Sequence, residues 1–113
     1  MNSLEHFIEH IPWTQSEKKV ARKAFDQAFE KQCASIKAEA EKMIAQAAAP
    51  SEIWRLHDYL TEHRRRVDAV YNYRYSRLLE VFGVLLRDGW LSEADLAGLQ
   101  QDKIDRIKRW AKI

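Results

Sequence analysis

Four side chains with binding or catalytic potential lie at helical spacing near the middle of the chain: Trp54, His57, Asp58 and Arg64. Steps of three, four and seven residues return to the same side of an α-helix, so these side chains would share one face. A histidine next to an aspartate does not by itself build a catalytic triad, and no activated serine or cysteine lies nearby in the sequence. Catalysis is therefore the weaker interpretation of this face.

Two non-catalytic interpretations stay open from the residues alone. The face could be solvated and held by ion pairs within the helix, such as Glu62 with Arg65 or Arg66, each worth about 0.2–0.5 kcal/mol. It could instead be a docking face, because Trp and Arg are enriched among the residues that dominate protein–protein binding. An exposed Trp54 favours the docking face.

Two other stretches have a spacing that is typical of metal sites, but both lack the additional ligands that such a site needs. His6 and His10 have the i, i+4 spacing of a metal clamp, but no HExxH motif or cysteine pair accompanies them, so we predict no metal site. The stretch RDGWLSEADL, residues 87–96, is similar to the end of a calcium loop. Aligning Gly89 with the sixth loop position puts Val84 and Leu86 where acidic ligands are needed, which excludes calcium.

Nucleic acid is also disfavoured. Basic and aromatic residues alternate over 64–66 and 71–77, as they do in single-strand binders. On the helix predicted here, Tyr71, Tyr73 and Tyr75 would point to different faces and could not form one stacking platform. The net charge of +2, from 19 basic and 17 acidic residues, lacks the basic excess expected of a nucleic-acid-binding domain.

The elements that must position these residues are helices. Thr14 and Glu17 form a capping box, and apolar residues at three- and four-residue steps predict a helix over about 14–47. Ser51 is predicted to cap a second helix that runs to about 87 and ends at Gly89. A short helix from Ser92, with Asp95 completing another capping box, a bend at Gly98 and a last helix over 102–113 would follow. The fold class is therefore all-α.

This pattern predicts one helical domain over residues 1–113, with a long antiparallel hairpin stalk over 12–87 and a small head over 88–113. Residues 1–11 would form a short amphipathic turn or arm that Pro12 interrupts. A helix of about 36 residues is about 54 Å long, so two of them make an extended hairpin with an uncovered apolar stripe. A second copy is the simplest cover, and we expect a homodimer. The interface candidates are Leu56, Leu60, Val67, Tyr71 and Arg74.

We predict a soluble cytoplasmic protein. Its single cysteine, Cys33, cannot form an internal disulfide and fits a reducing compartment. The N-terminus has no basic leader followed by an apolar core, and no stretch of about 18 apolar residues exists to enter a membrane.

The order of these pieces resembles the fluorescence recovery protein family. The resemblance rests on WRLHDYL at residues 54–60, followed by Arg64 and then by Val67, Asp68, Tyr71 and Arg74. The segments PWTQSE, VFGVLLRDGWL and DKIDRIKRW extend it over roughly residues 12–110. The Trp-x-Leu-His-Asp core with Arg64 is the specific part, and the flanking segments support it.

The resemblance implies a dimeric, all-helical regulator without enzyme activity or cofactor. Such proteins bind the photoactivated orange carotenoid protein, chiefly through its C-terminal domain, and speed its return to the resting orange form. This ends the quenching of phycobilisomes. The family's partner-binding positions fall on Trp54, His57, Asp58 and Arg64, and the aromatic Tyr59 belongs to the same motif. The alternatives are a relative that serves as a scaffold for an unrelated partner and, less favoured, a nucleic-acid-binding helical dimer.

Overall fold

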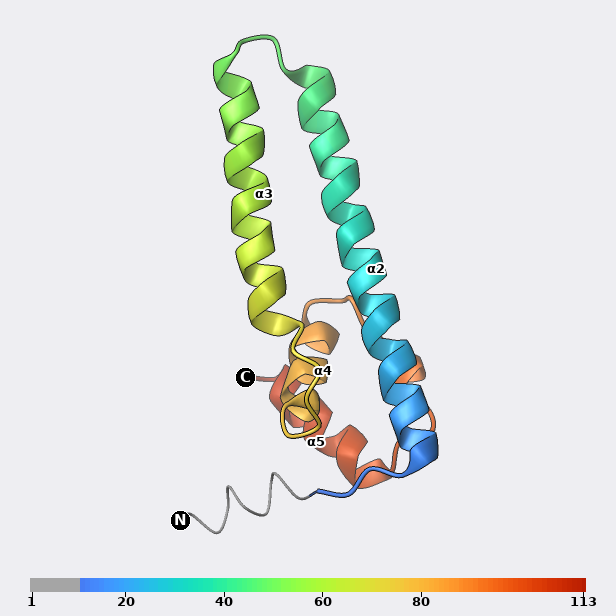
Figure 1. The fold of residues 1–113 in the computed structure, drawn as a ribbon. Coiled ribbons are helices and arrows are strands. Elements are labelled where there is room, and N and C mark those ends of the chain that lie inside the picture. The colour runs from blue at the N-terminus through green and yellow to red at the C-terminus, as the bar shows by residue number, and fades with distance from the viewer. Residues whose placement is uncertain (1–10) are drawn as a thin grey trace.

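The computed structural model describes residues 11–113, and these residues form helices and no strand, which confirms the all-α prediction. Within residues 11–113, four α-helices and a 3-10 helix follow one another. Figure 1 shows their arrangement. They are α2 (Gln15–Gln46), α3 (Ser51–Val70), α4 (Leu78–Arg87), the 3-10 helix η1 (Glu93–Leu96) and α5 (Gln101–Ala111).

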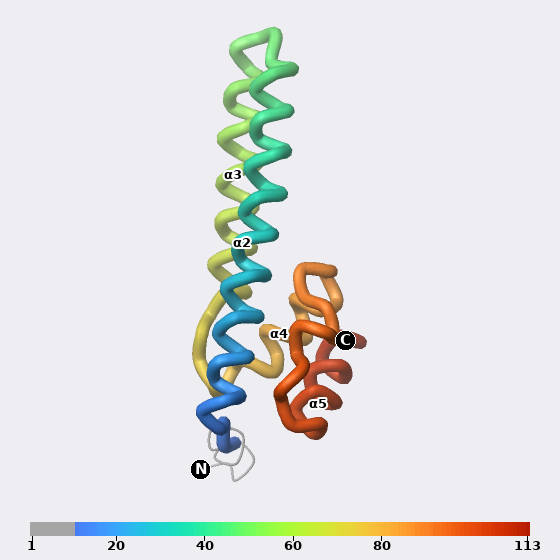
Figure 2. The backbone as a smooth tube through the Cα atoms, turned by 90° about the vertical axis from the view of Figure 1, so that its right-hand side faces the viewer, coloured from blue at the N-terminus to red at the C-terminus, as the bar shows by residue number. Residues whose placement is uncertain are grey.

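The two longest helices form an antiparallel hairpin, which we call the stalk. Figure 1 shows α2 and α3 running side by side, and Figure 2 shows the remaining helices on one side of the hairpin. The molecule extends 56 Å along its longest axis, and its radius of gyration is 17.4 Å. A compact chain of this size would have a radius of gyration of about 13 Å. The predicted extended shape is therefore present in a single chain.

The start of α2 is capped as the sequence predicts. The Thr14 hydroxyl accepts a hydrogen bond from the Glu17 amide at 3.1 Å, and the Glu17 carboxylate accepts one from the Thr14 amide at 3.1 Å. Two of the amides that a helix start leaves unpaired are thereby satisfied.

The predicted cap of α3 was wrong. Ser51 is the first residue of the helix, and Pro50 takes the N-cap position without a side-chain hydrogen bond. The longer Glu52 side chain reaches back instead and accepts hydrogen bonds from the amides of Ala48 and Ala49. These two hydrogen bonds lower the pKa of the Glu52 carboxyl. The cap is thus supplied from inside the first turn.

The prediction of one continuous helix from 51 to about 87 was also wrong, because α3 ends at Val70 and α4 begins at Leu78. The rings of Tyr71 and Tyr73 meet Phe25 edge-on, with centroids 5.4 and 5.0 Å apart. Packing these aromatic rings against α2 favours an irregular turn over continued helix, since aromatic pairs add stabilisation beyond the area they bury.

After this turn α4 packs mainly against α5, so the break redirects the chain away from the stalk. We therefore use "head" below for residues 78–113. Gly83 allows the close approach, because a Cβ atom there would lie 2.3 Å from the Trp110 Cβ. Gly89, with a φ of 85°, ends α4 in the left-handed conformation that the sequence predicts. The Ser92–Asp95 capping box is present too, on a 3-10 helix of four residues.

The hydrophobic core lies where the head meets the N-terminal half of α2. Small alanines on α2 let the head helices approach closely, and large side chains from α4 and α5 fill the space. The cluster consists of Ala21, Ala24, Phe25, Ala28, Leu78, Val81, Phe82, Leu85, Leu91, Leu96, Leu99 and Ile107. The far half of the stalk contributes no residue to this cluster.

A buried ion pair locks the same junction. Both Glu17 and Lys103 are at most 2% exposed, and the Lys103 ammonium lies 3.2 Å from the Glu17 carboxylate. The second carboxylate oxygen accepts a hydrogen bond from the Gln100 amide at 3.0 Å. Burial by itself raises the pKa of Glu17, but the hydrogen bonds from Gln100, Thr14 and Lys103 outweigh it and hold the pKa below its ordinary value. The start of α2 is thereby tied to the start of α5.

Candidate functional site

The outer face of α3 displays four of the predicted site residues together: Trp54, His57, Asp58 and Arg64. The whole Trp54 residue is 67% exposed, and the side chains of His57, Asp58 and Arg64 are 65%, 82% and 85% exposed. A tryptophan left this open beside charged groups is an unusual use of a large apolar side chain. The helix holds all four on one side without covering any of them.

Interactions among these side chains are loose. The rings of Trp54 and His57 meet edge-on with centroids 6.1 Å apart, and the His57 Nδ1 lies 3.4 Å from the Asp58 Oδ1. Arg64 reaches Asp68, one turn further along α3, at 3.6 Å. Exposed ion pairs of this kind contribute about 0–1 kcal/mol. The charged groups can therefore exchange their present neighbours for groups on a partner at little cost.

Tyr59 lies apart from the other four. It is partly buried, and its ring centroid lies 4.3 Å from that of His63 on the next turn. Burial raises the pKa of the Tyr59 hydroxyl, and the nearby carboxylate of Glu39 on α2 raises it further. Its partial burial and the proximity of Glu39 indicate that Tyr59 lies toward α2, on the inner side of the hairpin.

The predicted ion pairs within α3 are confirmed. Glu62 lies 3.8 Å from Arg65 and 3.2 Å from Arg66. Arg65 follows Asp58 by seven residues and so lies on the same side of the helix as Asp58. The solvated-face interpretation therefore describes Glu62, Arg65 and Arg66. It leaves the exposure of Trp54 without an explanation.

Two cavities in the described part of the chain lie away from the outer face. One is at the stalk tip near Met43 and Arg55, and the other is on the head. Residues 11–113 also contain no group of three side chains placed to hold a metal ion. His6 and His10 lie outside the described residues. The exposed side chains of the outer face are accessible for contact with another molecule.

The dimer-interface candidates divide into two groups. Val67 is buried by the hairpin itself, and Tyr71 donates a hydrogen bond to the Gln32 side chain at 2.8 Å, so both already serve the single chain. Leu56 is partly buried, whereas Leu60 is 41% exposed and Arg74 lies exposed in the turn after α3.

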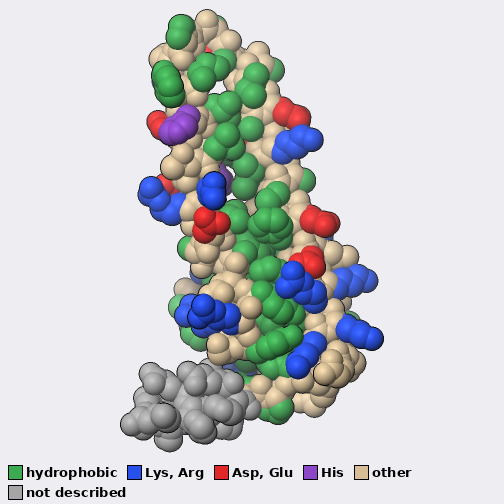
Figure 3. All heavy atoms as spheres, viewed as in Figure 1, with side chains coloured by type: hydrophobic (Ala, Val, Ile, Leu, Met, Phe, Trp, Pro, Cys, Tyr) green, Lys and Arg blue, Asp and Glu red, His purple; other side chains and the backbone are tan. Residues whose placement is uncertain are grey.

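Apolar side chains continue along the stalk beyond the core. Figure 3 shows a band of hydrophobic side chains between the two arms on the viewed face. Independently, the large apolar residues that remain exposed on the stalk include Phe29, Ile44, Ile53 and Leu60, at 41%, 56%, 49% and 41%. These side chains lie outside the core cluster and stay uncovered in the single chain.

The tyrosines considered for nucleic-acid stacking do not fan around a helix, because residues 71–77 are not helical. Tyr71 and Tyr73 pack on α2, and burial raises the pKa of both hydroxyls, that of Tyr73 to about 12. The Arg22 guanidinium lies 4.5 Å from the Tyr73 ring centroid and so occupies a position that a base would need. The aromatic turn is structural.

Sequence reasoning missed a pocket on the head. It is a cavity of about 570 Å³ between the turn before α4, α4 itself and α5, with Trp110 and Arg109 in its lining. The signal was present in the sequence, because Arg106, Arg109 and Trp110 recur at steps of three and four along α5, and Ile113 follows just after the helix.

None of the helices in residues 11–113 has the length and apolarity that crossing a membrane would require.

Together, the helical hairpin, the small head and an exposed Trp–His–Asp–Arg face define a helical regulatory protein that acts by binding. Residues 13–111 match the family model described as photoprotection regulator fluorescence recovery protein, and the chain belongs to this family. The family predicted from the WRLHDYL motif is thereby confirmed.

Individual relatives agree with this assignment. The fluorescence recovery protein of Synechocystis sp. is 30% identical over 102 residues, which cover 90% of this chain and 94% of that protein. Its solved structure superposes with a TM-score of 0.87 and covers 90% of this chain and all of the other. The structure of the Fremyella diplosiphon fluorescence recovery protein is 34% identical with a TM-score of 0.86 and the same coverage.

Proposed function

We propose that this protein binds the photoactivated orange carotenoid protein and accelerates its return to the resting form, which ends phycobilisome quenching. The observation that carries this proposal is the outer face of α3. By the resemblance, Trp54, His57, Asp58 and Arg64 fall on the family's partner-binding positions, and all four are exposed on one side of a helix. Family membership supplies the partner, and the exposed face supplies the means of contact.

The mechanism we propose needs no covalent step. A binding protein speeds a conformational reversal when it binds the transition state between the two forms more tightly than the starting form. Trp54 would anchor the contact by filling an apolar pocket on the partner. Asp58 and Arg64 would set the orientation and the encounter rate through their opposed charges, because exposed charges act mainly on association.

We further propose that the protein acts in the cytoplasm as a homodimer. The support is the apolar surface of the stalk, where Ile44 and Ile53 are about half exposed in the single chain. Removing apolar surface from water favours association, so a second copy that covers these side chains would be favoured. Leu56 and Leu60 would join that interface.

The experiment is a mixing assay. An orange carotenoid protein is photoactivated, the light is removed, and the red-to-orange absorbance change is followed with and without this protein. We expect a clear acceleration that Trp54→Ala and Arg64→Leu abolish. The matched control is Arg66→Leu, since Arg66 is also exposed on α3 and paired within the helix but lies off the outer face.

The outcomes separate the candidate functions. Acceleration lost only in the outer-face variants establishes both the activity and its face. Acceleration that survives both variants would move the contact to another surface. A folded protein with no effect on the carotenoid protein would indicate a relative with a different partner, to be sought by pull-down from its own host.

A further inference from the structure

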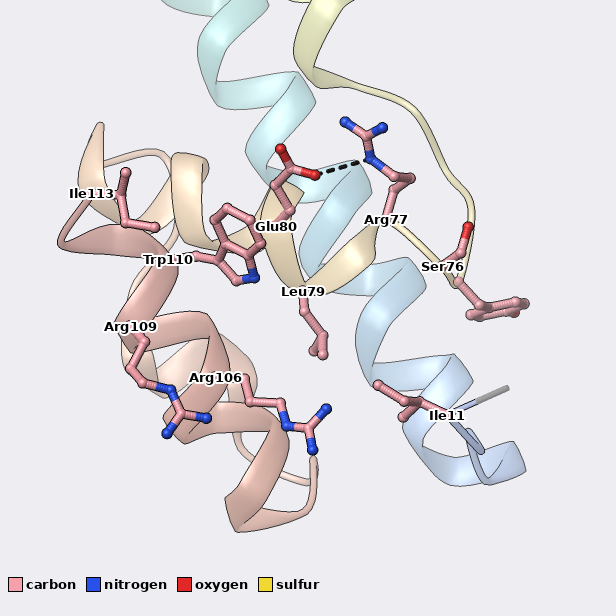
Figure 4. A pocket seen from close by; sticks show the side chains of 10 residues that line it. Ile11, Ser76, Arg77, Leu79, Glu80, Arg106, Arg109, Trp110 and Ile113 are labelled. Carbon is pink, nitrogen blue, oxygen red and sulfur yellow. Dashed lines mark ion pairs between the residues drawn. The ribbon is translucent and has the colours of Figure 1, made fainter. Parts of the chain in front are cut away.

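The head carries a pocket that the outer face of α3 does not explain. Its volume is about 570 Å³, within the range of about 300–1,000 Å³ that is typical of ligand pockets. Figure 4 shows Leu79 and Trp110 in this pocket, with Arg109 on one side and the Arg77–Glu80 ion pair on the other. The pocket therefore combines an apolar floor with charged groups on two sides.

The packing of the head holds the apolar floor in place. Leu79 packs against the hydrophobic core, and Trp110 lies where α5 presses on Gly83 of α4. A Cβ atom at Gly83 would lie 2.3 Å from the Trp110 Cβ, so the two helices are in close contact there. Trp110 nevertheless stays 41% exposed, and Ile113, which lines the same pocket, is 84% exposed. The floor is thus preformed, and its apolar surface is open to a ligand.

Arg109 gives the pocket a preference for one kind of ligand. Within residues 11–113 the Arg109 guanidinium has no hydrogen bond, ion pair or aromatic ring contact, whereas Arg77 is paired with Glu80. An arginine fork matches two oxygens of a carboxylate or a phosphate with two parallel hydrogen bonds. An unpaired guanidinium beside an apolar floor therefore favours a ligand with an anionic end and an apolar body.

The remaining charged groups limit the charge of that ligand. The Arg77 Nε lies 3.0 Å from the Glu80 carboxylate, so this ion pair adds no net charge to the lining. Arg106 also lines the pocket and is already engaged by another group. A phosphate monoester carries about −1.5 to −2 charges at pH 7 and would face Glu80 across the pocket. A carboxylate carries one charge, which a single guanidinium can pair, so the lining favours a monocarboxylate.

We propose that the head pocket binds an apolar monocarboxylate, with its carboxylate on Arg109 and its hydrocarbon body on Leu79 and Trp110. The hydrocarbon body supplies most of the affinity, because the removal of apolar surface from water drives such binding. The carboxylate fixes the orientation, as the few polar contacts of a ligand pocket do. The site lies on the head, apart from the outer face of α3, and does not rest on the proposed function.

Decanoate, kept below its micelle concentration, is the probe. It is added to the full-length, isotope-enriched protein while the indole N–H signals of the four tryptophans are followed by NMR. We expect a saturable shift at Trp110 and none at Trp54, which lies on α3 and outside the pocket lining. A linear drift of all four signals would indicate unspecific binding of an amphiphile and would overturn the proposal, as would a Trp110 signal that does not shift.

Matched probes separate the charge from the chain. Decanol has the same chain without a charge, decylammonium reverses the charge, and acetate keeps the carboxylate without the chain. We expect each to bind at least about tenfold more weakly than decanoate, because each loses a charge-assisted hydrogen bond or the apolar contact. Decanol that binds as tightly as decanoate would overturn the assignment of a carboxylate. Decyl phosphate that binds more tightly than decanoate would assign the anionic end to a phosphate and overturn it too.

Variants of the lining assign the contacts. Arg109→Gln should weaken decanoate binding about tenfold, as expected when a charge-assisted hydrogen bond is lost. Arg109→Lys should give an intermediate affinity, because an ammonium keeps the charge and loses the fork. The matched control is Lys112→Gln, which makes the same charge change on an exposed residue outside the lining and should leave the affinity unchanged. Equal losses in Arg109→Gln and Lys112→Gln would indicate general electrostatic attraction and overturn the proposal.

A second copy of the chain is the competing occupant of this pocket. A Trp110 signal that changes with protein concentration in the absence of decanoate would assign the pocket to a contact between copies and overturn the proposal. A Trp110 signal that is independent of protein concentration and shifts only with decanoate supports it. No carotenoid protein enters these samples, so a failure here leaves the proposed function untouched.

Discussion

The Lys103 ammonium lies 3.2 Å from the Glu17 carboxylate, although the two residues are 86 positions apart in the sequence. The same ammonium lies 5.2 Å from the ring centroid of Trp13. Every buried side-chain polar atom in residues 11–113 has a hydrogen-bond partner, so this pair is fully satisfied. Because Glu17 also caps α2, one carboxylate organises both the start of the stalk and the docking of α5.

Removing one member of this pair should be costly. Glu17→Gln leaves the Lys103 ammonium buried without a counter-charge, and breaking a buried pair costs about 3–5 kcal/mol. Urea unfolding at pH 7 should show that loss as a lower midpoint with an unchanged slope. The double variant Glu17→Gln/Lys103→Met should recover part of the loss, because the uncompensated charge is gone. A double variant as unstable as the single one would mean that the hydrogen bonds to Gln100 and Thr14 dominate.

Acid should weaken the same junction. The folded-state pKa of Glu17 lies below its ordinary value of 4.5, so the folded protein binds this proton less readily than the unfolded chain. Its stabilising contribution is therefore complete above about pH 4.5 and is lost as the pH falls through the folded-state pKa. Unfolding free energies measured between pH 7 and pH 3 should fall less steeply in Glu17→Gln than in the parent. Identical slopes in the two proteins would assign the acid sensitivity to other carboxyls.

Gly83 should tolerate no side chain. In an exposed helix, Gly→Ala is stabilising by about 1 kcal/mol. Here a Cβ atom would lie 2.3 Å from the Trp110 Cβ and 3.1 Å from the Ile107 carbonyl oxygen, so α4 and α5 would have to separate. We expect Gly83→Ala to cost about 1–3 kcal/mol overall, as overpacking does. A raised melting temperature would show that the two helices can separate freely.

Helix ends could be predicted from the sequence where residues close in the chain determine them. The capping box at Thr14 and the left-handed Gly89 both depend on residues a few positions apart, and both are confirmed. The WRLHDYL motif led to the family, and the spacing of Trp54, His57, Asp58 and Arg64 put them together on the exposed side of α3.

The errors arise where distant contacts override the local pattern. The apolar spacing of residues 67–85 continues as if one helix were present, yet Tyr71 and Tyr73 gain more by packing against Phe25 than by extending α3. The Glu17–Lys103 pair could not be predicted either, because it joins segments at opposite ends of the described chain. Tyr59 was grouped with the site by motif, although its position on α3 turns it toward α2.

Trp54 should matter for binding and hardly at all for folding. Trp54 is 67% exposed and is not part of the core cluster. Trp54→Ala should therefore change the unfolding free energy by less than about 0.5 kcal/mol. Affinity for the photoactivated orange carotenoid protein should fall at least tenfold, because buried tryptophan anchors carry a large share of interface energy. Tyr59→Ala is the matched contrast, since Tyr59 packs the hairpin and its loss should lower stability. If Trp54→Ala instead lowered stability as much as Tyr59→Ala and left affinity unchanged, Trp54 would be covered within the assembled protein, and the partner-binding face would have to lie elsewhere.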